Sequence, residues 1–421
     1  MELRKGYKQT EVGVIPEDWE VKQLGELFNF SGGFTASREQ LSTEGFCYLH
    51  YGDIHLSSKS FIDVEKEYQE IPKLCISQKL VPSKSLLNEG DVVFVDASED
   101  DEGASKHIVV RNQHGITYIS GLHTIVSKNK DDSMDNRYKQ YCFQTSDVKK
   151  QFKFYAVGTK VSGISKTNIA KIQIPFPAKP EQTAIATALS DTDALIGSLE
   201  KLIAKKQAIK QGAMQELLTG KRRLPGFSGK WEDKLLKEIV NEFIVPMRDK
   251  PKVFKGNIPW CRIEDFDGKY LFDSKSKQYV DREVIQQMNL KVHPKETLIV
   301  SCSADLGRCA IIKKPLVTNQ TFIGLVINDK KASNEFLFYY MSYNAEALNM
   351  LSSGTTISYL SREQFEAFEV FIPSSEEQTA IAAVLSDMDV DIEVLEQKLA
   401  KYRCIKQGMM QELLTGKTRL L

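Results

Sequence analysis

Residues 181–221 read EQTAIATALSDTDALIGSLEKLIAKKQAIKQGAMQELLTGK, and residues 377–417 repeat them as EQTAIAAVLSDMDVDIEVLEQKLAKYRCIKQGMMQELLTGK. The two segments align without a gap and share 27 of their 41 residues. A second match joins Trp19-Glu20 to Trp231-Glu232. The chain therefore contains an internal duplication, and each half consists of a divergent region followed by a nearly constant segment.

The constant segment has the pattern of a long helix. Its apolar residues recur at steps of three and four, as in helices that pair through one face. Pro180 suits the first turn of a helix, and Gly220 and Gly416 occupy positions where helices usually end. We predict that the two helices pair through Ile185, Leu189, Ile196, Leu199 and Ile203 in the first copy and Ile381, Leu385, Met388, Ile392, Leu395 and Leu399 in the second.

Each helix exposes an apolar stripe that must be covered. The chain offers one other matching stripe, so we expect the two helices to pair with each other in a pseudo-twofold molecule. Two alternatives stay open: each stripe packs on its own divergent region, or the protein dimerises. The chain ends favour pairing, because residues 417–420 match residues 221–224, and residues 225–231, which follow, match residues 15–19. A closed body that is cut once would leave this cyclic pattern.

The divergent regions mix strand and helix patterns. Apolar runs predict strands at 91–95, 107–110, 297–300 and 322–327, and helical patterns occur at 136–152 and 334–351. The predicted fold class is α+β, with two globular domains separated by a pair of long antiparallel coiled-coil helices. We place the first domain at 1–179, the first helix at 180–220, a linker at 221–230, the second domain at 231–375, the second helix at 376–416 and a tail at 417–421.

Composition limits the class of protein. With 42% hydrophobic and 27% charged residues, the chain is expected to fold and is neither disordered nor fibrous. The 56 basic and 56 acidic side chains cancel, so net charge gives no support for a nucleic-acid partner. Seven cysteines without a CxxC pair indicate neither disulfides nor a zinc site. Neither a signal peptide nor a run of roughly 18 apolar residues is present, which predicts a cytoplasmic protein without a membrane partner.

Motifs for catalysis are missing from the sequence. Residues 416–418 (GKT) resemble the end of a phosphate-binding loop, but Gln411 stands where that motif needs its first glycine. The chain has no GxGxxG fingerprint and no Asp/Asn-Pro-Pro-aromatic tetrapeptide of the kind that holds an extruded adenine. The histidine pairs 50/55 and 107/114 lack the spacing of metal or acid-base sites. We therefore predict no catalytic residue, no metal site and no cofactor bound by this chain.

Basic residues gather toward the ends of the two predicted helices. Residues 200–223 carry seven Lys or Arg against two Glu, and residues 396–421 carry six against two. Because the total charge is zero, the rest of the chain is mildly acidic. Cations suit the C-terminal end of a helix dipole, and they also suit contact with phosphate or with an acidic protein. The sequence leaves these explanations open.

Taken together, these motifs resemble the specificity (S) subunit of type I restriction-modification systems. The resemblance runs through nearly the whole chain, with residues 12–24 (VGVIPEDWEVKQL), 224–231 (LPGFSGKW), both EQTAIA helix starts and both QELLTGK helix ends. It implies that each divergent region is a target recognition domain that reads one half of a split site in double-stranded DNA. It also implies that the paired helices set the separation of the domains and dock two methyltransferase (M) subunits.

The resemblance further implies that the chain itself is not catalytic. Adenine methylation with S-adenosylmethionine would belong to the M subunits, and translocation and cleavage with ATP and Mg would belong to restriction (R) subunits that join the complex. Because the two divergent regions differ in sequence, we expect unlike half-sites in an asymmetric bipartite target. Two recognition domains held by a stiff pair of helices would place these half-sites about one turn of the DNA helix, ~34 Å, apart.

The side chains that contact DNA are predicted from residue type and loop context. Glycine permits close approach of the backbone, Lys and Arg reach phosphate or guanine, and Asn and Gln pair with adenine. These criteria select, in the first half, Ser31, Gly32, Gly33, Thr35, Lys106, Gly158, Thr159, Lys160 and Ser162, and in the second half, Arg248, Arg262, Arg308, Asn319, Gln320, Gly354, Thr355, Thr356 and Ser358.

An alternative function is a coiled-coil protein-interaction scaffold that reads no DNA. A scaffold accounts for the helices and the neutral charge. It does not account for divergent middle regions beside nearly identical helices, which a changing target and a constant partner explain. A free-standing DNA enzyme would need catalytic motifs that the sequence lacks.

Overall fold

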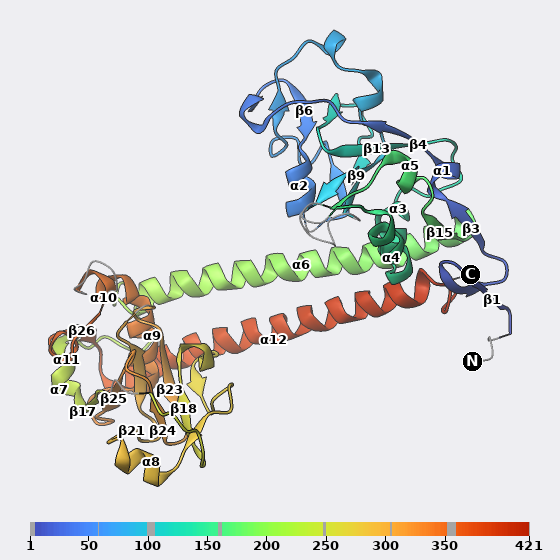
Figure 1. Ribbon diagram of the computed structural model, residues 1–421. Helices are drawn as coiled ribbons and strands as arrows, with labels where there is room; N and C mark the ends of the chain where they lie inside the picture. The colour runs from blue at the N-terminus through green and yellow to red at the C-terminus, as the bar shows by residue number, and fades with distance from the viewer. Residues whose placement is uncertain are drawn as a thin grey trace. The chain divides into compact units, whose positions relative to one another are not determined.

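The computed structural model describes residues 5–57, 59–98, 106–158, 162–246, 250–303, 305–351 and 359–420. The chain divides into two compact units. Unit 1 comprises residues 1–199 and 398–421, and unit 2 comprises residues 200–397. Two long helices, α6 (Lys179–Leu217) and α12 (Ser375–Leu413), each contribute residues to both units (Figure 1).

Unit 1 is built around a mixed five-stranded sheet. All four side chains of its central strand β9, Val-Val-Phe-Val, are buried, because both faces of the strand are covered. In sheet order the strands are β4 (Phe28–Gly32), β13 (Thr124–Asn129), β9 (Val92–Val95), β11 (His107–Arg111) and β7 (Phe61–Asp63). Its other strands are β12 (Tyr118–Ser120), β6 (Phe46–Leu49), β8 (Lys73–Leu74) and β5 (Leu41–Ser42) in a second sheet, and the pairs β15 (Gln173–Phe176) with β3 (Glu20–Gln23), β1 (Tyr7–Thr10) with β2 (Gly13–Pro16), and β10 (Ala97–Ser98) with β14 (Ser162–Gly163).

Short helices connect the strands of unit 1. They are α1 (Leu24–Leu27), α2 (Tyr51–Leu56), α3 (Lys139–Cys142), α4 (Ser146–Tyr155) and α5 (Lys166–Ile169), with single 3-10 turns at Arg38–Gln40, Gln78–Leu80 and Ser83–Ser85. The prediction of one helix over 136–152 was wrong. The Thr145 side chain accepts a hydrogen bond from Val148 N and caps a new helix there, so the apolar pattern continues across a break between α3 and α4.

Unit 2 repeats this construction. Its five-stranded sheet consists of β17 (Val240–Ile244), β25 (Phe322–Ile327), β22 (Leu298–Ser301), β23 (Cys309–Ile312) and β19 (Tyr270–Leu271). The remaining elements are the strands β20 (Tyr279–Val280), β18 (Ile258–Cys261), β24 (Leu316–Thr318), β21 (Val292–His293), β16 (Glu232–Leu235) and β26 (Glu369–Ile372), and the helices α7 (Leu236–Ile239), α8 (Arg282–Gln287), α9 (Asn334–Tyr343), α10 (Ala345–Leu351) and α11 (Arg362–Glu366), with a 3-10 turn at Ile263–Asp265. The predicted helix 334–351 is likewise divided, because Asn344 leaves helical geometry between α9 and α10.

The two divergent regions share one topology despite their unlike sequences. Strand order β4-β13-β9-β11-β7 in unit 1 corresponds to β17-β25-β22-β23-β19 in unit 2. In both sheets the last strand is parallel to its neighbour and the other pairings are antiparallel. The predicted α+β class is confirmed, and the strands expected at 91–95, 107–110, 297–300 and 322–327 are β9, β11, β22 and β25.

The apolar stripes of the long helices belong to the cores of both units. In unit 1, Ile185 of α6 and Leu413 of α12 join a buried cluster that includes Trp19. In unit 2, Ile381 of α12 and Leu217 of α6 join the corresponding cluster. Each stripe therefore contacts its own divergent region and also the other long helix. Along the two stripes, Ile196, Met388 and Leu395 are half-buried, and the other positions singled out in the sequence are buried: Ile185, Leu189, Leu199, Ile203, Ile381, Leu385, Ile392 and Leu399.

Ion pairs join the two long helices inside each unit. In unit 2, Lys206 Nζ lies 2.8 Å from Asp391 Oδ2, and Lys210, further along α6, pairs with Asp389, further back along α12. In unit 1, Lys406 Nζ lies 2.6 Å from Asp193 Oδ1. The two helix segments within unit 2 are therefore antiparallel.

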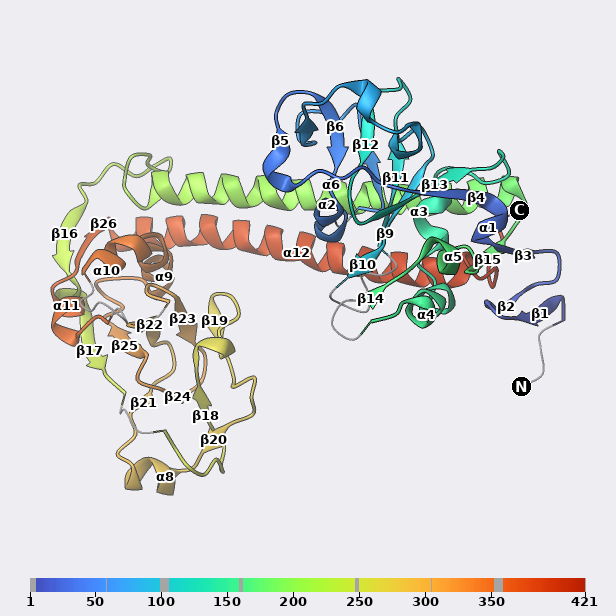
Figure 2. The same cartoon turned by 45° about the horizontal axis from the view of Figure 1, so that its top comes forward.

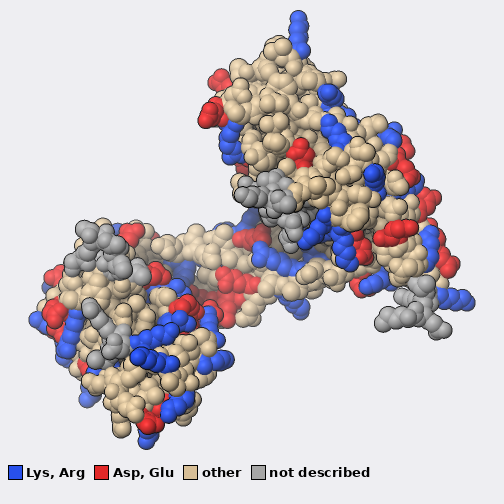
Figure 3. Space-filling view, in the orientation of Figure 1, with Lys and Arg blue, Asp and Glu red and all other residues tan. Residues whose placement is uncertain are grey.

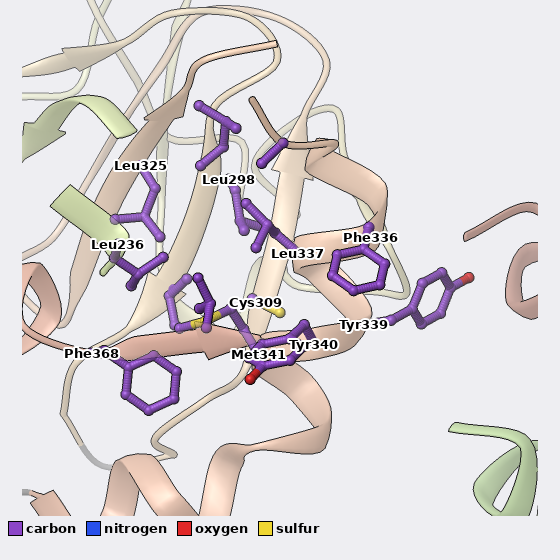
Figure 4. Packing of buried hydrophobic residues seen from close by; sticks show 14 of the residues in the cluster. Leu236, Leu298, Cys309, Leu325, Phe336, Leu337, Tyr339, Tyr340, Met341 and Phe368 are labelled. Carbon is purple, nitrogen blue, oxygen red and sulfur yellow. The ribbon is translucent and has the colours of Figure 1, made fainter. Parts of the chain in front are cut away.

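Side chains of α9 fill the core of unit 2. Figure 4 shows Leu337 directed toward Leu298 of β22, and Met341 belongs to the same buried cluster as Leu325 of β25. Tyr339 points away from this group, and its hydroxyl donates to Asp389 Oδ2 of α12 at 2.6 Å. The helix thus joins the sheet on one side and the long helix on the other.

Glycines follow the long helices at the expected places. Gly220 and Gly416 have φ of +69° and +68°, the left-handed conformation that reverses the chain at a helix end. A Cβ atom on Gly416 would lie 2.5 Å from Pro16 Cδ, so the position also lacks room for a side chain. None of the helices in the described ranges has a stretch long and apolar enough to cross a membrane.

Candidate nucleic-acid interface

In unit 1, segments far apart in the sequence meet beyond the C-terminal end of β9. The Ala97 carbonyl lies 3.4 Å from His55 Nε2, and Lys106 Nζ donates to the His55 carbonyl at 2.6 Å. Asp96 Oδ1 lies 3.3 Å from His123 Nδ1. We name this surface face 1 and define it by these five residues. Figure 2 shows its elements together, with β10 and β14 below α2.

The pair β10–β14 extends face 1. Ala97 stands opposite Gly163 in this pair, and Val157 forms a bridge to Gly163. The pairing brings Gly158 and Ser162, two residues singled out in the sequence, to the edge of face 1. Two further candidates from the same loop, Thr159 and Lys160, lie outside the described residues.

A second loop is held against this region by its glycine. A Cβ atom on Gly33 would lie 1.7 Å from the Gly121 carbonyl oxygen, so only glycine fits there. Phe34 N donates to Ser120 O at 2.7 Å, and Tyr48 Oη donates to Phe34 O at 2.8 Å while accepting from Leu122 N. The loop at 31–35 therefore lies beside the turn that carries His123.

The candidates in this loop differ in exposure. Thr35 is exposed, Ser31 is half-buried and donates to Lys84 O at 2.7 Å, and Gly32 has the Lys166 ammonium beside it. Thr35 is thus the side chain most open to a ligand, whereas Gly32 and Gly33 present backbone.

In unit 2, the corresponding surface collects the candidates of the second half. Asn319 N donates to Cys261 O at 3.3 Å, which places Asn319 next to Arg262. The Arg262 guanidinium lies 5.7 Å from the centre of the Trp260 ring, with Nη1 3.3 Å from Glu264 Oε1. We define face 2 by Arg262, Arg308, Asn319 and Gln320.

The remaining groups of face 2 also have defined surroundings. Arg308 is exposed, with Nη2 3.1 Å from the Phe266 carbonyl and Nη1 3.3 Å from Asp305. Gln320 is exposed, and Thr321 Oγ1 donates to Asn319 Oδ1 at 2.7 Å, which orients that amide. The other candidates of this half lie outside the described residues: Arg248, Gly354, Thr355, Thr356 and Ser358.

Face 1 and face 2 occupy the same place in the repeated fold. Lys106 precedes β11 and Arg308 precedes β23, its counterpart. Each of these cations donates to a backbone carbonyl in the segment after the equivalent strands β6 and β18, at His55 and Phe266 respectively. The structure therefore brings sequence-distant candidates together twice, on equivalent surfaces with unlike side chains.

Sequence reasoning missed a group of rings on face 1. The Tyr51 ring lies 4.6 Å from that of His50, 6.3 Å from that of His55 and 5.4 Å from that of His123, between centroids. Burial lowers the pKa of His50, and the nearby Arg38 guanidinium adds to this effect. The spacing of His50 and His55 gives no hint that His123 joins them from the turn between β12 and β13. No group of three or more His, Cys, Asp or Glu within the described ranges is arranged to hold a metal ion.

Charge is mixed over the visible surface of each unit. Figure 3 shows Lys and Arg interspersed with Asp and Glu, and the sequence contains 56 residues of each kind. The cation of face 1 is Lys106, and the cations of face 2 are Arg262 and Arg308. Attraction to phosphate by long-range charge is accordingly weak for this chain.

Comparison with known proteins gives consistent matches over the whole chain. The family model for the type I restriction modification DNA specificity domain matches twice, over residues 16–211 and 229–401. The putative type I restriction enzyme MjaX specificity subunit of Methanocaldococcus jannaschii is 27% identical, covering 99% of this chain and 97% of the relative. The MjaVIII specificity subunit of the same organism is 25% identical over 96% of this chain and 94% of the relative.

Solved structures match in fold. The type I restriction-modification S subunit from M. genitalium has a TM-score of 0.57 at 15% identity, with 98% of each chain covered. A chain solved in work on complex assembly and conformational transition of the type I R-M system has a TM-score of 0.58 at 17% identity, covering 96% of this chain and 99% of that one.

Proposed function

The chain belongs to the type I restriction modification DNA specificity family, and from this premise we propose that face 1 and face 2 each read one half of a bipartite, asymmetric DNA site. The chain carries two copies of the specificity domain and is the non-catalytic, DNA-recognising member of its system. Its part in the complex is to choose the sequence at which other subunits act.

The observation that carries this proposal is the equivalence of the two faces. One backbone framework presents Lys106 in unit 1 and Arg308 in unit 2, and it presents His50 after β6 where unit 2 has Arg262 after β18. Lysine and arginine favour guanine, whereas the amide side chains of face 2, Asn319 and Gln320, suit adenine. Equal scaffolds with unlike side chains therefore favour two unlike half-sites.

The long helices supply the second part of the proposal. We propose that α6 and α12 form one antiparallel coiled coil in a pseudo-twofold molecule, and that they dock two methyltransferase subunits. The boundaries 1–179, 180–220, 221–230, 231–375, 376–416 and 417–421 then separate recognition domains, helices, linker and tail. Restriction subunits join through the complex in the cytoplasm, and S-adenosylmethionine, ATP and Mg are bound by the partners.

The weak long-range attraction between this chain and DNA explains why the chain would depend on its partner subunits for affinity. Contacts to phosphate dominate the affinity of most DNA-binding proteins, and this chain has no net positive charge to supply them. We therefore expect the isolated chain to bind DNA weakly and the complex with methyltransferase subunits to bind it tightly. Specificity would come from the two faces and affinity from the assembly.

Methylation mapping tests the proposed function. The chain is co-expressed with its cognate methyltransferase subunit, and N6-methyladenine is mapped across the host DNA by single-molecule sequencing. We expect one split motif with an unread gap, which disappears when this gene is deleted. Exchange of residues 19–179 for the corresponding stretch of a relative should change one half of the motif and leave the other half intact.

The scaffold alternative makes the opposite forecast. If methylation is unchanged by the deletion and the exchange, and the chain still binds its partners, it is an assembly factor that reads no DNA. Loss of methylation at every site after the exchange, with the exchanged protein folded, would also contradict independent half-site readers.

A further inference from the structure

Unit 1 contains a cavity of about 480 Å³ at the end of β11 opposite to Lys106. Its wall includes Arg111, the last residue of β11, together with Arg137, Gln140, Glu89 and Asp63. No function described above uses this cavity. Its polar groups come from β7, β11, α3 with the turn before it, and the segment before β9, so the fold itself holds them in place.

Two guanidinium groups of the cavity have no carboxylate partner. Within the described part of the chain, neither Arg111 nor Arg137 takes part in an ion pair, and both are half-buried. The Arg111 guanidinium lies 3.6 Å from the centre of the Phe61 ring, which fixes its plane. Burial lowers the pKa of Arg111; the nearby charges of Asp63 and Glu89 oppose this effect, and that of Arg137 adds to it.

A third donor in the cavity is also unsatisfied. The Gln140 side chain is 1% exposed, and its Nε2 has no hydrogen-bond partner in the described residues. A buried amide N–H without an acceptor costs on the order of 1–3 kcal/mol, so an external acceptor at this place is favoured. The cavity thus offers three donor groups and lacks the acceptor that they need.

The carboxylates in the wall are already engaged. Asp63 Oδ2 lies 2.8 Å from Lys66 Nζ, and Glu65 Oε1 lies 3.4 Å from His114 Nδ1. Glu89 Oε2 accepts a hydrogen bond from Asn112 N at 2.6 Å. Their negative charge disfavours a doubly charged phosphate but leaves room for a singly charged group between the two arginines.

Unit 2 has a carboxylate at the corresponding place. Tyr141 and Tyr339 occupy equivalent positions, because each donates to an aspartate of a long helix, Asp193 or Asp389. Four residues before these tyrosines stand Arg137 and Glu335. The acceptor of unit 2 is therefore replaced in unit 1 by a cation.

Contacts around Glu335 indicate what the cavity of unit 1 lacks. Glu335 accepts from the hydroxyl of Tyr270 and pairs with Lys269 Nζ at 3.2 Å. Tyr270 is the counterpart of Phe61, since both stand opposite the equivalent residue of β23 or β11 in the sheet register. Unit 2 therefore satisfies these groups internally, whereas in unit 1 Arg137 stands at the place of Glu335 and Phe61 at the place of Tyr270.

We propose that the cavity of Arg111, Arg137 and Gln140 binds a carboxylate group from outside the chain, in the place that Glu335 fills in unit 2. Arginine binds carboxylates through two parallel hydrogen bonds, and two arginines with one amide can satisfy both oxygens. The carboxylate belongs either to a small free acid or to an acidic side chain of a docked methyltransferase subunit, and the second source rests on the proposed function.

The first experiment measures the thermal unfolding of the full chain in Tris chloride as acetate or glutarate replaces chloride at constant ionic strength. A ligand that binds the folded state raises the melting temperature with ligand concentration. If a free acid is the source, we expect a saturable rise for the wild type, and at least tenfold weaker binding for R111Q and R137Q. R222Q, which removes an exposed arginine of unit 2, is the matched control and should respond as the wild type does.

A charge-reversal variant separates binding from a merely structural role. R137E restores the carboxylate that unit 2 carries at this position, so it should pair with Arg111. We expect R137E to melt at a higher temperature than R137Q in chloride alone and to show no response to acetate or glutarate. A lower melting temperature for R137E than for R137Q would contradict the proposed complementarity.

The second experiment measures binding of the cognate methyltransferase subunit in a buffer free of carboxylates. If its side chain is the source, R111Q and R137Q should each weaken binding about tenfold, and added glutarate should compete in the wild type only. The proposal is overturned if free carboxylates leave the wild-type melting temperature unchanged and the variants bind the subunit normally. If the wild type does not bind the subunit at all, the docking proposal fails, and the melting experiment alone decides whether the cavity binds a carboxylate.

Discussion

Arg419, near the C-terminus, forms a two-pronged ion pair with Glu181 in the first turn of α6. Arg419 Nε lies 2.6 Å from Glu181 Oε1, and Nη2 lies 2.9 Å from Oε2. The Glu181 side chain is 3% exposed, and it also accepts from Trp19 Nε1 at 2.9 Å. Asp18 completes the group by accepting from both Nη atoms of Arg419. The end of the chain is thus joined to its beginning through the first long helix.

Unit 2 contains a corresponding ion pair in the middle of the chain. Arg223 makes a two-pronged ion pair with Glu377 in the first turn of α12, and its guanidinium lies 5.8 Å from the centre of the Trp231 ring. The cyclic sequence pattern predicted that the two chain ends would meet as an internal junction does. The ion pairs of Arg419 in unit 1 and Arg223 in unit 2 are the contacts that make these two junctions equivalent.

Removal of Arg419 should destabilise unit 1 strongly. R419A leaves Glu181 buried without its positive partner, and the loss of one member of a buried pair costs about 3–5 kcal/mol. Urea unfolding of the full chain should therefore show a transition at lower urea for R419A. R222A, which breaks an exposed pair with Glu216, should change the free energy of unfolding by less than about 1 kcal/mol. Equal effects of the two substitutions would mean that the buried pair contributes no special stability.

Much of this architecture follows from sequence because it depends on repetition and periodicity. The 27 shared residues reveal the duplication, and apolar steps of three and four locate Ile185 and Ile381 on the buried sides of long helices. β9 and β22 are recognisable because a strand buried on both faces must be continuously apolar. These features depend on residues that are close together in the sequence, so local patterns are enough to predict them.

Local patterns do not predict which segments far apart in the sequence will be in contact. Nothing in the single sequence indicates that His123 lies against Tyr51, or that Arg137 shares a cavity with Arg111, since tertiary packing alone brings them together. The break between α3 and α4 was missed for a related reason. One hydrogen bond of Thr145 outweighs an apolar pattern that continues through it.

Gly33 should tolerate no side chain. In G33A, the new methyl group would meet the Gly121 carbonyl at 1.7 Å, so the loop at 31–35 must move away from face 1. We expect a loss of about 1–3 kcal/mol in the free energy of unfolding, with altered recognition by unit 1 only. G197A is the control, because Gly197 lies in α6 with open space around it and alanine should stabilise a helix by up to about 1 kcal/mol. Equal stability of G33A and the wild type would show that the loop adapts freely.

Lys106 and Arg308 should govern separate half-sites. A good contact from either cation to a guanine edge contributes about 1–3 kcal/mol of discrimination against the wrong base, or roughly 5- to 150-fold. K106Q should relax or weaken methylation at one half of the split motif, and R308Q should do so at the other half. R362Q, which removes an exposed arginine paired with Glu366, should leave the motif unchanged. If both substitutions affect the same half, the assignment of one face to each half-site is wrong.

Unit 2 should lose stability in mild acid through His293. This side chain is fully buried in β21, with Nε2 2.9 Å from Thr318 Oγ1, and burial lowers its pKa to about 4. A histidine of the unfolded chain has a pKa of about 6.5, so between these values the unfolded state binds more protons than the folded state. The stability that depends on a neutral His293 is fully present above about pH 6.5. It is lost as the pH falls toward 4, which lowers the free energy of unfolding by about 3 kcal/mol in total.

Urea unfolding of the wild type and of H293Q at several values between pH 7 and pH 4.5 measures this effect. H293Q removes the titrating ring, and its amide can still bond to Thr318. It should therefore lower stability at pH 7 and flatten the decline between pH 6.5 and pH 4.5. H114Q, at a histidine whose side chain is 80% exposed, should leave the pH dependence as it is in the wild type. A decline that persists unchanged in H293Q would assign the acid sensitivity to other groups.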